Sequence, residues 1–211
     1  MGLCICIGNE KGGTGKSTIT ANLAVEAVKE GMRVLVIDAD SQQSSIDFRG
    51  IRADKNGLPQ FQAVSIVKNT IHKDIGSFHD FDLIIIDAGG RDTAVFRSAI
   101  FAADILLIPV LPSQYDIWAT AGTVEALEQA KTFKDNIKAR FIVNQVIPNT
   151  NIAKEALQAI EEFGIPLLNS RLCVAYKQSI GEGKGVTEYE PNGKAAGEIK
   201  SLYEEVKVLW Q

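Results

Sequence analysis

The stretch from Gly8 to Thr18, which reads Gly-Asn-Glu-Lys-Gly-Gly-Thr-Gly-Lys-Ser-Thr, constrains the fold more than any other part of the chain. A short apolar run at residues 3–7 precedes it and predicts a strand. A helical pattern follows it, with apolar residues on one face at Ile19, Leu23, Ala24, Ala27 and Val28. A strand, a glycine-rich turn and a helix in this order form the context that a phosphate-binding loop requires.

The residue types in this loop suit a phosphate ligand. Glycines lack a Cβ atom, so the backbone can curl and direct several N–H groups inward. The helix expected to begin near Lys16 adds free N–H groups and its partial positive charge. Lys16 supplies a mobile charge for the β- and γ-phosphates, and the Ser17 hydroxyl can bind Mg²⁺. The predicted nucleotide-binding residues here are Gly12, Gly13, Thr14, Gly15, Lys16, Ser17 and Thr18.

Apolar runs alternate with helical patterns along the rest of the chain. This alternation predicts an α/β fold, a single P-loop domain over residues 1–211 with a mainly parallel twisted sheet and helices on both faces. Residues 46–60 are mostly polar and predict irregular structure. Further strands are expected at 33–37, 82–87, 105–108 and 139–143, with a short run at 165–168, and further helices near 65–76, 117–133, 151–163 and 193–210.

Composition narrows the function classes. The 211 residues carry a net charge of −4, so any contact with nucleic acid requires a local basic patch. No apolar run reaches membrane-spanning length, and we expect neither a leader peptide nor stable membrane insertion. Three cysteines without paired spacing favour a reducing cytosol. Cys4 and Cys6 are interpreted as buried thiols rather than as half of a metal site, because no further ligands stand nearby.

An acidic residue ends the clearest of the predicted apolar strands. Asp87 ends the run at residues 82–87, where a carboxylate can hold Mg²⁺ directly or through water. Gly89 and Gly90 come next and would let a backbone amide approach the γ-phosphate and let the segment move as a second switch. Alone, Asp87 would read equally well as a cap on the following turn. With the phosphate loop present, the metal role is favoured.

The loop departs from the usual phosphate-loop pattern at one position. Glu10 stands where that pattern has glycine, and a second lysine, Lys11, comes just before the glycines. The string Lys-Gly-Gly-Thr-Gly-Lys-Ser resembles the deviant phosphate loop of the ParA/MinD group of P-loop ATPases. By this resemblance Lys11 also binds nucleotide, and it reaches across a dimer to the nucleotide of the partner. An intramolecular role, in which Lys11 touches its own phosphates, stays open.

The resemblance extends to other motifs. Asp38 and Asp40 lie in Asp-Ala-Asp-Ser-Gln, where the family has Asp-x-Asp-Pro-Gln. The resemblance implies that Asp38 lies near the metal with Ser17 and Asp87, and that Asp40 orients or deprotonates the attacking water. Lys11, Lys16 and Asp40 are therefore the predicted catalytic residues. Asn144 stands where the family reads the adenine edge with a side-chain amide.

The likeness is closest to the small ParA-type plasmid and chromosome partition ATPases without an N-terminal DNA-binding extension, and it covers nearly the whole chain. It implies a cytoplasmic, nucleoid-associated enzyme with ATP and Mg²⁺ as cofactors, which hydrolyses ATP to ADP and phosphate. It implies an ATP-dependent homodimer on non-specific DNA, stimulated by a ParB-like or other small centromere-binding protein. Segment 107–113 resembles part of the family's dimer face. The candidate DNA contacts are Arg171, Lys177 and Lys184, in a region of weak net charge.

Two other classes stay open. A MinD-like ATPase that positions a membrane or protein cargo would need a basic amphipathic C-terminal helix. The acidic and basic residues of segment 194–207 are balanced, so its apolar stripe is expected to be core. A metabolic P-loop kinase or ligase would use the same loop on a small acceptor, and Lys11 argues against it. A nitrogenase-type reductase is discarded, because Cys173 alone follows Asp87 and cannot share a cluster.

Overall fold

The computed structural model describes residues 2–90, 93–146, 158–173 and 177–210. In this part of the chain, seven strands form one sheet in the order β3-β2-β4-β1-β5-β6-β7, and all neighbouring pairs are parallel. This confirms the predicted α/β fold with a parallel sheet. The strands are β1 (Leu3–Gly8), β2 (Val34–Asp38), β3 (Gln62–Ser65), β4 (Leu83–Ala88), β5 (Ile105–Val110), β6 (Lys138–Asn144) and β7 (Leu167–Leu172).

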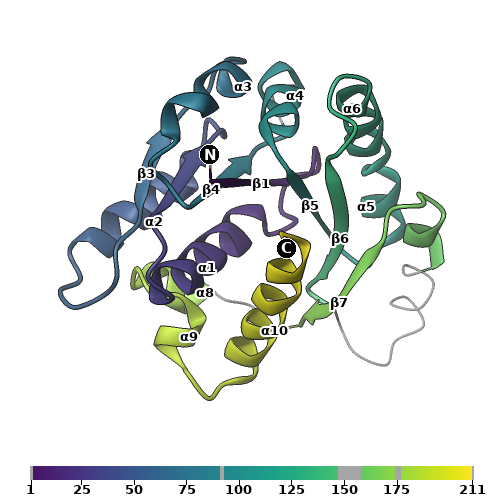
Figure 1. The fold of residues 1–211 in the computed structure, drawn as a ribbon. Coiled ribbons are helices and arrows are strands. Elements are labelled where there is room, and N and C mark those ends of the chain that lie inside the picture. The colour runs from purple at the N-terminus through teal and green to yellow at the C-terminus, as the bar shows by residue number, and fades with distance from the viewer. Residues whose placement is uncertain (1, 91–92, 147–157, 174–176, 211) are drawn as a thin grey trace.

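Helices cover both faces of the sheet (Figure 1). One face carries α1 (Lys16–Lys29), α2 (Ser44–Ala53), α9 (Val186–Tyr189) and α10 (Lys194–Leu209), with α8 (Lys177–Gly181) beside α2 and α9. The other face carries α3 (Ile71–Asp74), the short 3₁₀ helix η1 (Ile75–Phe78), α4 (Thr93–Ala102), α5 (Gln114–Trp118) and α6 (Ala121–Lys131).

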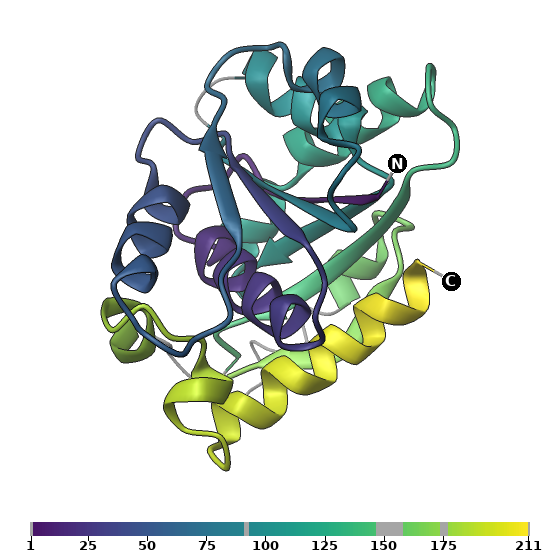
Figure 2. The ribbon, with the colours of Figure 1, turned by 60° about the vertical axis from the view of Figure 1, so that its left-hand side comes forward.

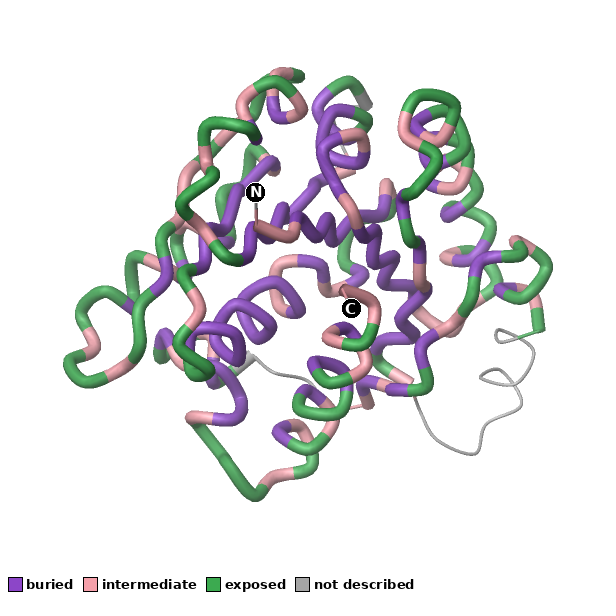
Figure 3. The backbone as a smooth tube through the Cα atoms, viewed as in Figure 1, coloured by how far each residue is buried: buried purple, intermediate pink, exposed green. Residues whose placement is uncertain are grey.

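The central strands are buried on both faces, as their continuous apolar runs predict (Figure 3). In β1 the side chains alternate: Cys4 and Cys6 pack toward α4, and Ile5 and Ile7 pack toward α1. Both thiols are fully buried and free, and the core interpretation of this Cys-x-Cys pair is therefore confirmed.

The C-terminal helix α10 lies along α1 and against β7 (Figure 2). Its residues Ile199, Leu202 and Val206 are fully buried, as the apolar stripe predicts. This face is therefore part of the core and is not available to a membrane surface. Within the described ranges, no helix combines the length and the apolar character that crossing a membrane requires.

Several boundaries differ from the sequence-based expectations. Residues 46–60 are not irregular throughout, because α2 occupies 44–53; Phe48 stacks on Phe61 and stabilises this helix from outside. The helix expected near 65–76 begins only at Ile71, since β3 extends to Ser65. The single helix expected over 117–133 is two helices, α5 and α6, with a break after Trp118, and α4 was not anticipated. Most of the helix expected at 151–163 lies outside the described residues, and residues 158–161 are helical.

Candidate nucleotide-binding site

The phosphate loop lies at the carboxyl end of β1, the middle strand, between β4 and β5. Ligands of parallel sheets bind at this edge. Gly13 and Gly15 have φ values of +80° and +93°, which residues with a side chain rarely adopt. A Cβ atom on Gly15 would lie 2.1 Å from Nδ2 of Asn144, whereas a Cβ on Gly13 would meet open space. The backbone at Gly15 is thus packed against Asn144, whereas the space beside Gly13 is free and can accept a phosphate.

Lys16 lies across this loop. Its side chain is largely buried, and its Nζ donates a hydrogen bond of 3.1 Å to the carbonyl oxygen of Lys11. Burial lowers the pKa of the amine, and the nearby charges of Asp87 and Asp40 act in the opposite direction. Among the described residues, the only hydrogen-bond acceptor of this amine is a backbone carbonyl, which an incoming phosphate can replace.

Asp87 is the buried carboxylate of the site. Its Cα is the register partner of Asp38 in the neighbouring strand β2. Burial raises the pKa of Asp87 to about 6, against the lowering effect of the hydroxyls of Ser45 and Ser17 and the charge of Lys16. The Ser45 hydroxyl donates to Oδ2 at 2.7 Å, and Oδ1 accepts no hydrogen bond among the described residues.

This unsatisfied oxygen is a test of whether Mg²⁺ fits the site. A buried acceptor without a donor is costly unless a ligand satisfies it. Mg²⁺ is usually bound by one or two carboxylates together with substrate phosphates and water. The described residues contain no cluster of three or more His, Cys, Asp and Glu side chains that could hold a metal by themselves. Asp87 and Ser17 beside a phosphate cradle therefore fit Mg²⁺ that arrives with a nucleotide.

Asp38 is held by the backbone. Oδ1 accepts the N–H of Asp40 at 3.1 Å, and Oδ2 accepts the N–H groups of Ser45 and Ile46 at 2.8 and 3.1 Å. Burial raises the pKa of this carboxyl group, and the three amides oppose the shift. Asp38 thus fixes the first turn of α2 against the end of β2. In this structure it positions Ser45 on Asp87, and its place near the metal stays a prediction.

The two predicted switches touch each other. The carboxylate of Asp40 lies against Gly89, where an added Cβ would be 2.3 Å from Oδ2. A Cβ on Gly90 would lie 2.2 Å from the backbone of Glu10 in the phosphate loop. Both glycines are therefore required by close packing in the structure. Their part in sensing the γ-phosphate stays a prediction.

Lys11 has a partner within its own chain. Its Nζ lies 3.7 Å from Oδ1 of Asp116 in α5, and its side chain is 45% exposed. Asp116 also accepts a hydrogen bond from the hydroxyl of Ser113, the N-cap of α5. The lysine thus contacts the segment that follows β5, next to the stretch 107–113 singled out from the sequence.

A buried network that the sequence did not indicate supports this arrangement. The Asn9 amide donates to the carbonyl of Pro109 at 2.9 Å and to the Thr120 hydroxyl at 3.3 Å. Its oxygen accepts from the Lys11 N–H and from the Thr123 hydroxyl, which in turn accepts the Glu10 N–H. The start of the phosphate loop is therefore bonded to β5 and α6. Apart from the bond between Lys11 and Asn9, these partners are 100 to 114 positions apart, and no local pattern identifies them.

Asn144 lies beside the loop at the end of β6. Its Nδ2 donates to the carbonyl of Thr14 at 2.8 Å, and its Oδ1 accepts the N–H of Gln145 at 2.9 Å. Both sides of the amide are engaged within the chain. Recognition of an adenine edge by Asn144 would require these bonds to exchange, and this role stays a prediction.

The candidate DNA contacts lie in β7 and in the segment 177–184. The Arg171 guanidinium donates to the carbonyls of Leu168 and Ser170, and its pKa is lowered by burial. Lys184 pairs with Glu182 at 3.2 Å. Lys177 begins α8. Arg171 and Lys184 thus already have partners in their own chain, and the DNA-binding role of the three residues stays a prediction.

Comparison with known proteins agrees with this geometry. Residues 5–184 match the family described as the CobQ/CobB/MinD/ParA nucleotide binding domain. The maintenance of carboxysome distribution protein A of Halothiobacillus neapolitanus is 31% identical over 96% of this chain and 95% of that protein. The chromosome-partitioning ATPase Soj of Thermus thermophilus is 25% identical over 60% of this chain and 62% of its own.

Solved structures share the fold. Apo McdA of Cyanothece covers 100% of both chains with a TM-score of 0.83 at 20% identity. An ATP complex of a variant of that protein covers 99% of this chain and 96% of its own, with a TM-score of 0.75 at 21% identity. The family match spans most of the chain and includes the phosphate loop, Asp38, Asp87 and Asn144. The chain therefore belongs to the CobQ/CobB/MinD/ParA family of nucleotide-binding domains, as a relative of the small ParA-type ATPases.

Proposed function

We propose that the protein is a Mg²⁺-dependent ATPase whose nucleotide state controls its pairing with a second copy. The observation that carries this is the grouping of Lys16, Asp40 and Asp87 around one phosphate loop. Lys16 provides the charge for the β- and γ-phosphates, and Asp40 orients the attacking water. Asp87 and Ser17 hold Mg²⁺, which neutralises negative charge on the phosphates when it is bound.

Lys11 provides the link between hydrolysis and pairing. In the proposed dimer its amine leaves Asp116 and meets the phosphates bound by the other copy. A cation supplied in this way increases the rate of phosphoryl transfer by about 10³–10⁵-fold. Turnover per molecule is therefore expected to rise with protein concentration.

We further propose that this cycle positions or segregates a cargo on non-specific DNA, with a partner protein that stimulates hydrolysis. The names of two relatives support this, since one maintains carboxysome distribution and the other partitions chromosomes. The cargo is thus DNA or a protein body, and a ParB-like protein is the expected partner for a DNA cargo. The burial of α10 counts against the membrane-cycling alternative.

The test measures two properties of the purified protein. Phosphate release is followed at several protein concentrations with Mg²⁺ or with EDTA, and binding to a labelled random-sequence DNA duplex is followed with ATP or ADP at rising salt. We expect Mg²⁺-dependent turnover that rises with concentration, and ATP-dependent DNA binding that falls steeply with salt. Lys16→Ala should abolish nucleotide binding, whereas Lys200→Ala, an exposed lysine of α10, should not.

Turnover that is independent of both Mg²⁺ and protein concentration would contradict the proposed switch. A product other than ADP and phosphate would indicate the kinase or ligase alternative. ATP-dependent pairing without DNA binding would favour a cargo that is carried on another surface.

A further inference from the structure

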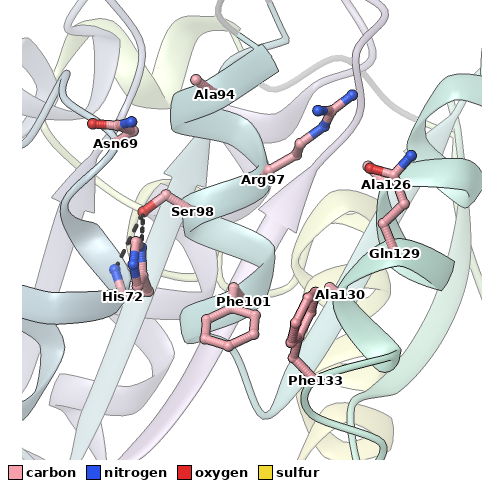
Figure 4. A pocket seen from close by; sticks show the side chains of 10 residues that line it. All are labelled: Asn69, His72, Ala94, Arg97, Ser98, Phe101, Ala126, Gln129, Ala130 and Phe133. Atoms are coloured by element: carbon pink, nitrogen blue, oxygen red, sulfur yellow. Dashed lines mark hydrogen bonds between the residues drawn. The ribbon is translucent and has the colours of Figure 1, made fainter.

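We propose that the hollow between α3, α4 and α6 is a docking site for a segment of another protein that carries a carboxylate next to a large apolar side chain (Figure 4). The hollow has a volume of about 370 Å³. Its floor is the outward face of α4, with Ala94, Arg97 and Phe101, and its walls come from α3 and α6. The nucleotide site contributes none of the described residues that line it. The inference goes beyond the proposed ATPase function and does not depend on it.

A row of aromatic rings forms the apolar end of the hollow. The rings of His72 and Phe101 meet edge to face with centroids 5.5 Å apart, and those of Phe101 and Phe133 with centroids 6.0 Å apart. A 2.8 Å hydrogen bond between His72 Nδ1 and the Ser98 hydroxyl fixes the first ring. Phe133 is 81% exposed, although it lies beside this row. An exposed phenyl ring next to a preformed apolar hollow is typical of an interface anchor.

Arg97 forms the charged end. Figure 4 shows its side chain extending from α4 toward α6, on the far side of the hollow from Phe101. The side chain is exposed and makes no hydrogen bond or ion pair with other described residues. The described residues that line the hollow include no aspartate or glutamate. A planar guanidinium without a carboxylate partner among the described residues is suited to a bidentate contact with a carboxylate from outside.

The combination selects a protein segment over other ligands. Nucleic acids and anionic membranes are bound by several cations, and the described residues of the lining include one arginine. The amides of Asn69 and Gln129 at the rim can pair with the backbone groups of a peptide. The aromatic row takes an aliphatic or aromatic side chain, and Arg97 takes an acidic one.

The spacing of the two ends predicts a motif. Arg97 and Phe101 are four residues apart on α4, which corresponds to about 6 Å along the helix axis. Two residues of an extended chain span about 6.6 Å. The docked segment should therefore carry its carboxylate and its large apolar side chain about two positions apart if it is extended, or three to four positions apart if it is helical.

The hollow also lies next to the second predicted switch. Its floor, α4, follows Gly89 and Gly90 along the chain. A protein docked on α4 would contact the helix that leads away from the nucleotide site. This position would allow a partner to influence hydrolysis without touching the phosphate loop.

The experiment uses a display library of random 12-residue peptides, selected on the full chain without nucleotide. We expect enriched peptides that share an acidic and a large apolar residue at the predicted spacing. Their affinity should fall at least tenfold for Arg97→Gln and for Phe133→Ser. Selection on Arg97→Glu should enrich lysine or arginine in place of the acidic residue. Arg33→Gln and Val208→Ser change another exposed arginine and an exposed apolar residue elsewhere, and both should bind as the wild type does.

Each side chain changed is exposed, so every variant should keep its fold, which urea denaturation verifies. No enrichment above the display background would overturn the proposal. Enriched peptides that bind Arg97→Gln and Phe133→Ser with unchanged affinity would also overturn it. Self-association of the chain that is lost in Phe133→Ser, or binding of DNA or anionic vesicles that requires Arg97, would assign the hollow to a different occupant and overturn it as well.

Discussion

The Nζ atom of Lys11 lies 3.7 Å from Oδ1 of Asp116 in the same chain. The carboxylate is mostly buried and fixed by Ser113, while the lysine is half exposed. A pair of this kind contributes little to stability, because solvent screens the exposed charge. The lysine expected to serve a second protomer therefore has a resting partner that it can exchange without a large loss of free energy.

Lys11→Ala should keep ATP binding and lose most of its turnover. Lys16 still contacts the phosphates, but the cation supplied by the other copy is absent. We expect kcat to fall by about 10³-fold or more, which corresponds to roughly 4 kcal/mol of barrier. ATP-dependent dimerisation, measured by analytical ultracentrifugation, should be lost as well. Lys200→Ala is the matched control, and a Lys11→Ala protein that dimerises as before would remove this residue from the mechanism.

Asp40→Ala should produce a dimer that retains ATP. The carboxylate lies against Gly89, beside the loop, and is the group assigned to the attacking water. Without it the nucleotide still binds, but water is no longer oriented, and hydrolysis should slow by at least about 10²-fold. Single-turnover phosphate release together with size-exclusion chromatography measures both effects. Asp135→Ala changes an exposed aspartate elsewhere, and equal turnover in the two variants would contradict the assignment.

Asp87→Asn should stabilise the ligand-free protein at neutral pH. The fold raises the pKa of Asp87 from 3.8 to about 6, so it favours the protonated form. The stability that this group contributes is fully present below pH 3.8 and is lost as the pH rises through about 6. Asparagine stays neutral, so the variant should gain up to about 3 kcal/mol of unfolding free energy at pH 7.5 and much less at pH 4.

Urea denaturation at both pH values, without nucleotide or Mg²⁺, measures the gain from Asp87→Asn. Asp82→Asn is the control with the opposite sign, because Arg33 lowers the pKa of that exposed carboxyl group. Removal of its charge should therefore reduce stability at pH 7.5. With Mg²⁺ and ATP present, the wild type should gain more than Asp87→Asn, because ligand binding stabilises the state that binds it. If the ligand-free wild type and Asp87→Asn differ in unfolding free energy by the same amount at both pH values, titration of Asp87 is not the cause of the difference.

Arg52→Met should be strongly destabilising. The guanidinium is fully buried and donates to Glu188 at 2.7 and 2.8 Å and to the carbonyls of Pro59 and Gly183. Truncation leaves the largely buried Glu188 carboxylate with the Gly185 N–H as its only hydrogen-bond donor among the described residues, which costs about 3–5 kcal/mol. Arg33→Met removes an exposed pair with Asp82 and should cost much less, because solvent screens exposed charges.

The double variant Arg52→Met/Glu188→Met distinguishes the cost of an unpaired buried charge from the cost of lost packing. It leaves no uncompensated charge in the core and should recover most of the loss seen in the single variant. Guanidinium chloride would screen these charges, so urea is the appropriate denaturant. Equal losses of unfolding free energy for Arg52→Met and Arg33→Met would show that the buried pair contributes no more to stability than the exposed pair.

The parts of this fold that could be predicted from the sequence are those encoded by local patterns. The glycines of the phosphate loop and the apolar runs of β1, β2 and β4 carry their signal in adjacent residues, and the structure has these elements where the patterns predict them. The burial of the apolar face of α10 follows from its helical spacing in the same way.

The elements that were missed depend on distant contacts. The helix α2 lies in a polar sequence and is stabilised by the Asp38 carboxylate, by Phe61 and by Glu188. The bond between Asn9 and Thr123 joins residues 114 positions apart. The sequence predicts Arg171 as an available cation, but its guanidinium turns back onto backbone carbonyls, which no local pattern reveals.

Because the two thiols of β1 are buried, their rate of chemical modification measures local opening of the sheet. Burial raises the pKa of Cys4 and of Cys6 well above the normal range, so neither sulfur forms the reactive thiolate in the native state. Cys173 is partly exposed. Alkylation by iodoacetamide should therefore modify Cys173 first, and the later modification of the two strand cysteines would record how often the centre of the sheet opens.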